Sequence, residues 1–202
     1  MLRLMCRAVA SGRLLLIAAV MAMSLLAADK QSGAQTAMPP EGSIISFALT
    51  APDGNAVTER TYRGKWLLVY FGYTFCPDVC PATLMEIAGA LAALGQRAEA
   101  VQGLFVTVDP RRDTREILSG YVKSFDPRIV GLTGPPPQIA MAAKSFNVFY
   151  ERRDMDDGGY VYDHTTLIYL VDPEGKFVKA IAGNAGAQQI ADALAAAMMA
   201  KR

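Results

Sequence analysis

The alternation of apolar runs with helix-like segments is the feature that most restricts the fold of this chain. Residues 65–71 and 101–108 form two nearly continuous apolar runs, as is typical of strands buried on both faces of a sheet. Each run is followed by a segment, 81–96 and 114–125, in which apolar side chains recur with helical spacing. This order predicts an α/β domain whose sheet is covered by helices on both faces.

Turn sequences divide the rest of the chain into further elements. An Asp-Gly-Asn turn at 53–55 predicts an N-terminal β-hairpin over residues 44–59, and an Asp-Pro-Glu-Gly turn at 172–175 predicts another over residues 165–181. The other expected elements are a short strand at 128–132, a helix that opens at the prolines 135–137, two extended arms at 147–153 and 159–162, and a last helix at 186–201.

The first 28 residues are expected to form a separate unit. Three arginines precede an apolar run without charges at residues 14–28, which is the pattern of a secretory signal peptide or a membrane anchor. Residues 29–42, with glutamine, serine, glycine and two prolines, are expected to form a flexible linker. Residues 43–202 are long enough for one domain with its own core. Because arginines favour the cytoplasmic side, we expect this domain on the periplasmic side of the bacterial inner membrane.

The charge of the chain excludes one class of partner. The formal net charge is +1 and the isoelectric point is about 7.7, and no long basic stripe is present. Nucleic acid binding normally depends on such a stripe. No nucleic acid partner is therefore expected.

The cysteines mark the candidate site. Cys6 precedes the apolar run, which leaves Cys76 and Cys80 in the predicted domain. A disulfide that closes so short a loop would add only about 2 kcal/mol before strain, so this spacing favours a redox pair or a metal clamp over a structural disulfide. Both cysteines lie between the apolar run 65–71 and the start of the predicted helix, where the helix dipole favours a thiolate.

His164 is the candidate third ligand. It is the only histidine in the chain, and it directly precedes an apolar run, so we expect it to open the strand at 165–171 with its ring at the edge of the sheet. Two thiolates and one imidazole form a soft site that selects Cu(I) or Zn(II). Structural zinc normally takes four protein ligands, and the fourth would have to be Asp78 or Asp163. The residue types thus favour copper held by Cys76, Cys80 and His164 and leave zinc open.

Three segments resemble the signature segments of the Sco/SenC family, in the same order and spacing. They are YFGYTFCPDVCPATL at 70–84, VDPRRDTREILSGYV at 108–122 and DHTTLIYLVDPEGKF at 163–177. The resemblance covers roughly residues 40–200 and implies a thioredoxin-like central sheet with flanking helices behind the N-terminal β-hairpin. It also implies copper bound by Cys76, Cys80 and His164, and delivery of that copper to the dinuclear copper centre of cytochrome c oxidase during its assembly. The implied partners are the oxidase subunit that carries this centre and other copper carriers.

The resemblance leaves a second function open. Some members of the family act as thiol–disulfide reductants of the cysteines in that copper centre, which would need Cys76 and Cys80 but not His164. Thioredoxins carry a cis-proline beside their dithiol, and by similarity that position falls near Thr165 here. The missing proline favours a metal site over a general disulfide oxidoreductase. A peroxidase would need an activating arginine beside its thiolate, which the sequence does not place.

Several polar residues near these motifs have a structural and a functional interpretation. Asp163 is either the hydrogen-bond acceptor that orients the His164 ring or a turn residue. Tyr70 and Asp109 are expected to be structural. The adjacent Arg111 and Arg112 either contact an acidic partner or form a solvated turn, and we expect the turn.

Overall fold

The computed structural model describes residues 38–201. The predicted signal or anchor at 1–28, Cys6 and most of the predicted linker lie outside this range, so the boundaries expected there stay predictions. Among residues 38–201, no helix is both long enough and apolar enough to span a bilayer.

A mixed sheet of five strands forms the centre of the domain. Its strand order is β5-β4-β3-β8-β9. Strands β3, β4 and β5 are parallel, β8 is antiparallel to β3, and β9 is antiparallel to β8 and so runs in the direction of β3. Every residue of β3 is buried because the strand lies in the middle of the sheet with both faces covered. The strands are β3 (Trp66–Gly72), β4 (Val101–Thr107), β5 (Ile129–Leu132), β8 (Leu167–Val171) and β9 (Phe177–Ala182).

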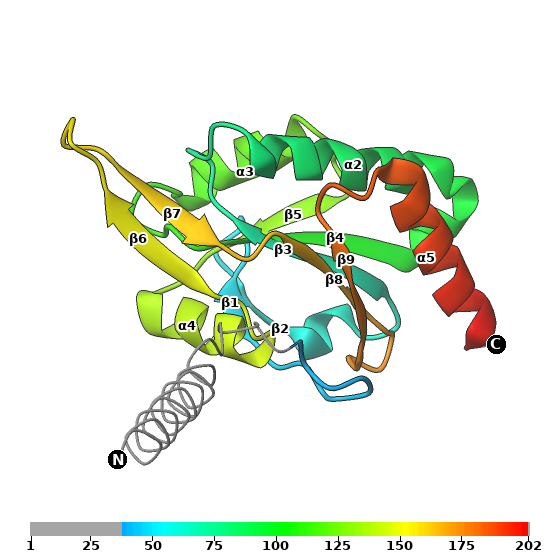
Figure 1. The fold of residues 1–202 in the computed structure, drawn as a ribbon. Helices are drawn as coiled ribbons and strands as arrows, with labels where there is room; N and C mark the ends of the chain where they lie inside the picture. The colour runs from blue at the N-terminus through cyan, green and yellow to red at the C-terminus, as the bar shows by residue number, and fades with distance from the viewer. Residues whose placement is uncertain (1–37, 202) are drawn as a thin grey trace, which may run out of the picture. The chain divides into compact units, whose positions relative to one another are not determined.

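Helices cover both faces of this sheet, as the sequence predicts. The helices α2 (Val79–Ala93), α3 (Arg115–Lys123) and α5 (Ala187–Ala200) lie on one face, and α4 (Pro136–Ser145) lies on the other (Figure 1). Helices α2 and α3 share a face because both connect neighbouring parallel strands by right-handed crossovers. Helix α2 ends earlier than predicted, and the short 3₁₀ helix η3 (Gly95–Ala100) completes the connection to β4.

Successive side chains of β3 point to opposite faces of the sheet and so contribute to two different halves of the hydrophobic core. Phe71 faces α4, where its ring centroid lies 5.3 Å from that of Phe146. Tyr70 points to the opposite face and packs against Phe105 at 6.0 Å. Because successive side chains of a strand point to opposite faces, Tyr70 projects toward the start of α2, where the cysteines lie.

Two hairpins lie outside the central sheet. The predicted N-terminal hairpin is confirmed, with shorter strands than expected: β1 (Ala48–Thr50) pairs with β2 (Ala56–Thr58), and the 3₁₀ helix η2 (Glu59–Tyr62) follows. The predicted extended arms form the antiparallel pair β6 (Tyr150–Asp154) and β7 (Tyr160–His164), which projects beyond the sheet (Figure 1).

Candidate metal centre

The cysteine loop connects the carboxyl end of β3 to the amino end of α2. The strand ends at Gly72, and α2 begins directly after its N-cap residue Asp78, so that Cys80 is its second residue. Pro81 fits in this first turn because the N–H that proline lacks has no partner within the helix there. Both cysteines are free thiols; Cys80 is fully buried and Cys76 is 8% exposed.

Buried hydrogen bonds hold this loop in place. Thr74, two residues before Cys76, donates to the carboxylate of Asp113 through its backbone N–H (3.0 Å) and its hydroxyl (2.5 Å). Thr107, at the end of β4, donates to the same carboxylate at 2.6 Å. Asp113 has no exposed surface, and burial raises its pKa. Local sequence patterns do not reveal this role: Asp113 stands directly before Thr114, the N-cap of α3, and its partner Thr74 lies 39 residues away.

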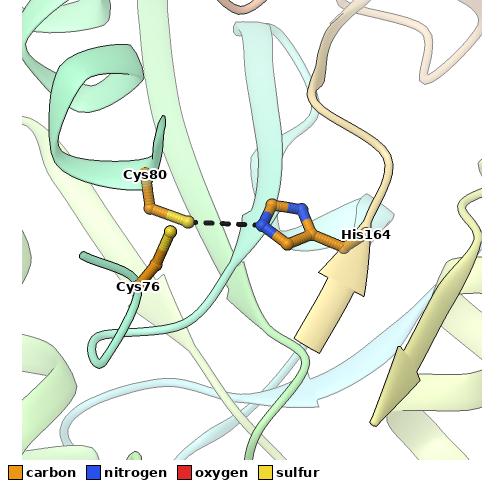
Figure 2. Close-up of side chains that lie close together, drawn as sticks. All are labelled: Cys76, Cys80 and His164. Carbon is orange, nitrogen blue, oxygen red and sulfur yellow. Dashed lines mark hydrogen bonds between the residues drawn. The ribbon is translucent and has the colours of Figure 1, made fainter. Parts of the chain in front are cut away.

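The structure brings Cys76, Cys80 and His164 together. The ligand atoms of these three side chains all lie within 4.8 Å of one another, and Nε2 of His164 is 3.4 Å from Sγ of Cys80 (Figure 2). The expectation that His164 opens the next strand was wrong. His164 is the last residue of β7, and β8 begins three residues later at Leu167.

The ring of His164 is oriented as a metal ligand. Its Nδ1 lies 3.1 Å from the carbonyl oxygen of Thr165. Because a carbonyl oxygen only accepts hydrogen bonds, Nδ1 carries a ring hydrogen, and Nε2 is the ring nitrogen that faces the sulfur of Cys80. A second hydrogen bond of this kind typically fixes the tautomer of a metal-binding histidine.

The spacing of the three ligand atoms fits a single ion. Thiolate–metal bonds of about 2.3 Å and imidazole–metal bonds of about 2.0 Å place the ligand atoms of a trigonal site roughly 3.7–4.0 Å apart. The observed separations of 3.4 Å and at most 4.8 Å require only small side-chain movements. Among residues 38–201, no carboxylate joins the group.

The two thiols share one proton. The side chain of Cys80, followed by that of His164 and the backbone N–H groups of Asp78 and Cys80, lowers the pKa of Cys76 to about 4, although burial opposes this shift. The interaction with Cys76, together with burial, raises the pKa of Cys80. Cys76 therefore carries the thiolate, and Cys80 keeps the proton between the two sulfurs until a metal replaces it.

Aromatic rings enclose the site on its inner side. The rings of Tyr70 and Tyr73 make edge contacts with the His164 ring, at centroid distances of 6.1 and 5.9 Å. The hydroxyl of Tyr70 also lies 3.9 Å from the sulfur of Cys80. Burial is the largest cause that raises the pKa of Tyr70, so its hydroxyl stays protonated. Tyr70 thus contacts the site, beyond the structural role expected from the sequence.

A surface pocket gives access to the ligands. Its volume is about 390 Å³, and Cys76 and His164 are part of its wall. Pro77, Asp78 and Val79 line one side, and residues of β6 and β7 line the other. The site is therefore open to a partner at its rim although both sulfurs are buried.

The structure rules out both interpretations of Asp163 and the expected role of Arg112. Asp163 is not a turn residue, because it lies within β7. Asp163 does not orient the His164 ring; it forms an ion pair with Arg153 at 3.2 Å, and both side chains are mostly exposed. Arg112 does not lie in a solvated turn, because its side chain is only 23% exposed and pairs with Asp109. Arg111 is exposed, as expected.

The model of the SCO1/SenC family matches residues 36–199, which include the cysteine loop, the buried Asp113 and the hairpin that carries His164. The chain belongs to the SCO1/SenC family. Both this membership and the thioredoxin-like fold expected from the resemblance are confirmed.

Sco proteins of known structure and sequence extend the comparison. The mitochondrial protein SCO1 homolog 1 of Arabidopsis thaliana is 40% identical over 147 residues, which cover 72% of this chain and 44% of that protein. This chain spans about half the length of the curated relatives it matches. ScoI of Bradyrhizobium japonicum, solved with copper bound, is 43% identical with a TM-score of 0.69, and the match covers 74% of this chain and 95% of that structure. BsSco, a member of the Sco family of cytochrome c oxidase assembly proteins in which a disulfide switch was identified, is 25% identical with a TM-score of 0.61, over 79% of this chain and 95% of that structure.

Proposed function

We propose that this chain binds one copper ion through Cys76, Cys80 and His164 and delivers it to the dinuclear copper centre of cytochrome c oxidase during assembly of the oxidase. The observation that carries the proposal is the convergence of two thiols and one correctly oriented imidazole within 4.8 Å. Its biological context comes from the family, since ScoI of Bradyrhizobium japonicum holds copper in the same fold.

The donor set favours copper over zinc. Thiolates are soft ligands that select Cu(I), which is stable with three ligands, whereas structural zinc normally takes four. The two carboxylates considered as a fourth ligand are not part of the group: Asp163 pairs with Arg153, and Asp78 is exposed at the start of α2. The imidazole is a harder ligand than the thiolates, so the site can also bind Cu(II).

Transfer to the acceptor follows from the position of the ligands at the pocket. Cys76 and His164 line its wall, so acceptor thiolates or imidazoles can replace these two ligands one at a time. Cys80 is fully buried, and it is therefore the ligand that leaves last.

We also propose that residues 1–28 anchor the chain in, or direct it across, the inner membrane, and that residues 29–42 tether the domain on the periplasmic side. The support is the order of arginines, apolar run and polar linker in the sequence. This placement would set the copper site on the side of the membrane where disulfides and copper ions are exchanged between exported proteins.

The second candidate function is reduction of the disulfide in that oxidase subunit. The lowered pKa of Cys76 favours it, as does the disulfide switch of BsSco. The Cys76 thiolate would attack the substrate disulfide and form a mixed disulfide, from which Cys80 would then displace the substrate thiolate. Two electrons pass to the substrate, which leaves with two thiols after protonation, and the chain is left with a Cys76–Cys80 disulfide.

Copper titration of the full-length chain tests the proposal. The protein is purified in a mild detergent, fully reduced and free of oxygen, in a Cys6→Ser background so that no other cysteine binds copper. We expect one tight equivalent of Cu(I) in competition with a chelator. Cys76→Ser, Cys80→Ser and His164→Ala should each weaken it by at least about tenfold, or about 1.4 kcal/mol.

The oxidation state of copper adds a second comparison. His164→Ala should weaken Cu(II) more than Cu(I), because imidazole is the harder ligand. Weak binding in the native chain, or binding that does not depend on His164, would overturn the copper proposal. The reduction potential of the Cys76–Cys80 pair would then become the decisive measurement for the reductase function.

A further inference from the structure

The guanidinium of Arg112 lies between the two segments that carry the metal ligands. Its central carbon is 3.7 Å from the ring centroid of Tyr160, the first residue of β7. On the other side, the same carbon is 4.7 Å from the ring centroid of Phe75, the residue before Cys76, and 5.7 Å from that of Tyr73. One cation thus stacks on the histidine hairpin and on the cysteine loop at once.

Hydrogen bonds fix Arg112 in this position. Its Nε donates to Asp109, a carboxylate without exposed surface, and its Nη1 donates to the backbone carbonyl of Tyr160 at 3.0 Å. The hydroxyl of Tyr160 donates to the second oxygen of Asp109 at 3.2 Å. We refer to Asp109, Arg112 and Tyr160 as the Arg112 clamp.

The hairpin needs such an attachment. Strands β6 and β7 pair only with each other in the described part of the chain, and an isolated two-stranded hairpin is at best marginally stable in water. His164 ends this hairpin, whereas Cys76 and Cys80 are held by the core through Thr74 and α2. The distance between the imidazole and the sulfurs therefore depends on contacts that tie the hairpin to the cysteine loop.

We propose that Arg112 is a positioning residue for the metal site, which holds the β6–β7 hairpin against the cysteine loop and keeps His164 within reach of the copper ion. This inference rests on the copper-binding function proposed above. The planar guanidinium suits the task because it stacks on aromatic faces while it forms directed hydrogen bonds in its own plane. A lysine would retain the charge and lose both the stacking and the paired hydrogen bonds.

Arg152 provides a matched control on the same ring. Its central carbon lies 3.9 Å from the centroid of Tyr160, which is close to the distance for Arg112. Arg152 pairs with Asp154, however, which lies on the same hairpin. It therefore stacks on Tyr160 without a connection to the cysteine loop, and its loss should leave His164 in place.

The test is a double-mutant cycle on Cu(I) affinity in the full-length, reduced chain, again in the Cys6→Ser background. Arg112→Met should weaken Cu(I) binding by about tenfold or more, the usual effect of losing a residue that supports a metal ligand. The Cu(I) affinity of Arg152→Met should stay within about twofold of that of the native chain, since this substitution changes no contact between the hairpin and the cysteine loop. In the His164→Ala background, Arg112→Met should have no further effect, because it acts through His164. An equal loss in both backgrounds would overturn the proposal.

A second measurement uses the metal-free chain and does not depend on copper. Hydrogen exchange in Arg112→Met should increase in the β6–β7 hairpin and stay unchanged in β3 and β4. An increase spread over the whole domain would indicate general destabilisation and would contradict the clamp. If Arg112→Met does not fold, Tyr160→Phe removes only the hydroxyl that binds Asp109 and should show a smaller change of the same kind.

The outcomes separate this inference from the proposed function. If the native chain fails to bind Cu(I), or if His164→Ala binds as the native chain does, the copper function is wrong. If copper binding depends on His164 while Arg112→Met binds like the native chain, the copper function stands and the Arg112 clamp is refuted.

Discussion

Replacing Gly72 with alanine should weaken copper binding while the domain stays folded. Gly72 ends β3 directly beneath the metal site, and a Cβ at this position would lie 2.8 Å from the sulfur of Cys80 and 2.8 Å from the ring of Phe105. The backbone of Gly72 is outside the left-handed region, so the substitution causes no conformational strain of its own. The effect therefore comes from the contact with the sulfur and the ring.

The size of the effect follows from these distances. Ordinary contacts between nonbonded heavy atoms are about 3.5 Å or longer, so each of the two contacts must open by about 0.7 Å. Phe105 is fully buried among other rings and resists this shift, but the sulfur of Cys80 has to move away from the new Cβ in either case. Metal–ligand bond lengths in a formed site stay within about 0.2 Å of their ideal values, so a sulfur displaced by more than this must move back against the new contact when the metal binds. We expect a loss of Cu(I) affinity of at least about tenfold, or about 1.4 kcal/mol, and a loss of stability of about 1–3 kcal/mol from overpacking.

Gly89→Ala is the matched control. Its Cβ would lie 2.7 Å from the Cβ of Ala187, where α2 packs on α5, so it introduces an equally short contact. Gly89 is nine residues beyond Cys80 on the same helix, about 13 Å away at 1.5 Å per residue. Chelator competition should show native affinity in Gly89→Ala, and thermal unfolding should show that both variants fold. Native affinity in Gly72→Ala, or an equal loss in both variants, would refute the reasoning.

Three further predictions concern the neighbours of the site. In the reduced, metal-free chain, Cys76 should react with iodoacetamide at a nearly constant rate from pH 8 down to about pH 5, because its pKa is lowered from 9.0 to about 4. A tenfold fall in the reaction rate for each pH unit in this range would contradict a stable thiolate. In denaturant titrations, Thr107→Val should lower the free energy of unfolding by about 2–3 kcal/mol, because the buried carboxylate of Asp113 loses a hydrogen bond. Thr166→Val, at an exposed threonine, should change it by less than about 0.5 kcal/mol. Asp163→Asn should keep the Cu(I) affinity of the native chain within about twofold, since it removes only an exposed ion pair; a larger loss would show that this carboxylate supports the histidine ligand after all.

The sequence predicted the three residues that converge at the candidate site more reliably than it predicted their neighbours. The position of the cysteines was predictable because a buried strand and a helix start are both local patterns, and Cys76 lies in the loop between them while Cys80 lies in the first turn of the helix. His164 was identified as the only histidine and through the resemblance, but it was assigned to the wrong strand. Thr165 and Thr166 are β-branched and read as part of the next strand. The alternation of Tyr160, Tyr162 and His164 was the signal for β7.

The supporting residues were not predictable from local patterns. Two adjacent arginines after a strand are typical of a solvated turn, and Arg112 was interpreted in that way. Its burial depends on the aromatic hairpin that folds over it, 48 residues further along the chain. Asp113 was missed for the same reason, because its partner Thr74 is 39 residues away.

The sequence by itself determined the succession of strands and helices, the placement of two cysteines at a helix start and the set of soft ligands, because spacing and residue type express these directly. Only the tertiary structure decided that a histidine 84 residues beyond Cys80 comes within 3.4 Å of its sulfur, and that Thr165 rather than Asp163 orients its ring. The physical reason is that this distance depends on how a hairpin outside the central sheet is held against the cysteine loop. That arrangement depends on stacking, ion-pair and hydrogen-bond contacts between segments far apart in the chain, and the local spacing of residues in the sequence does not reveal these contacts.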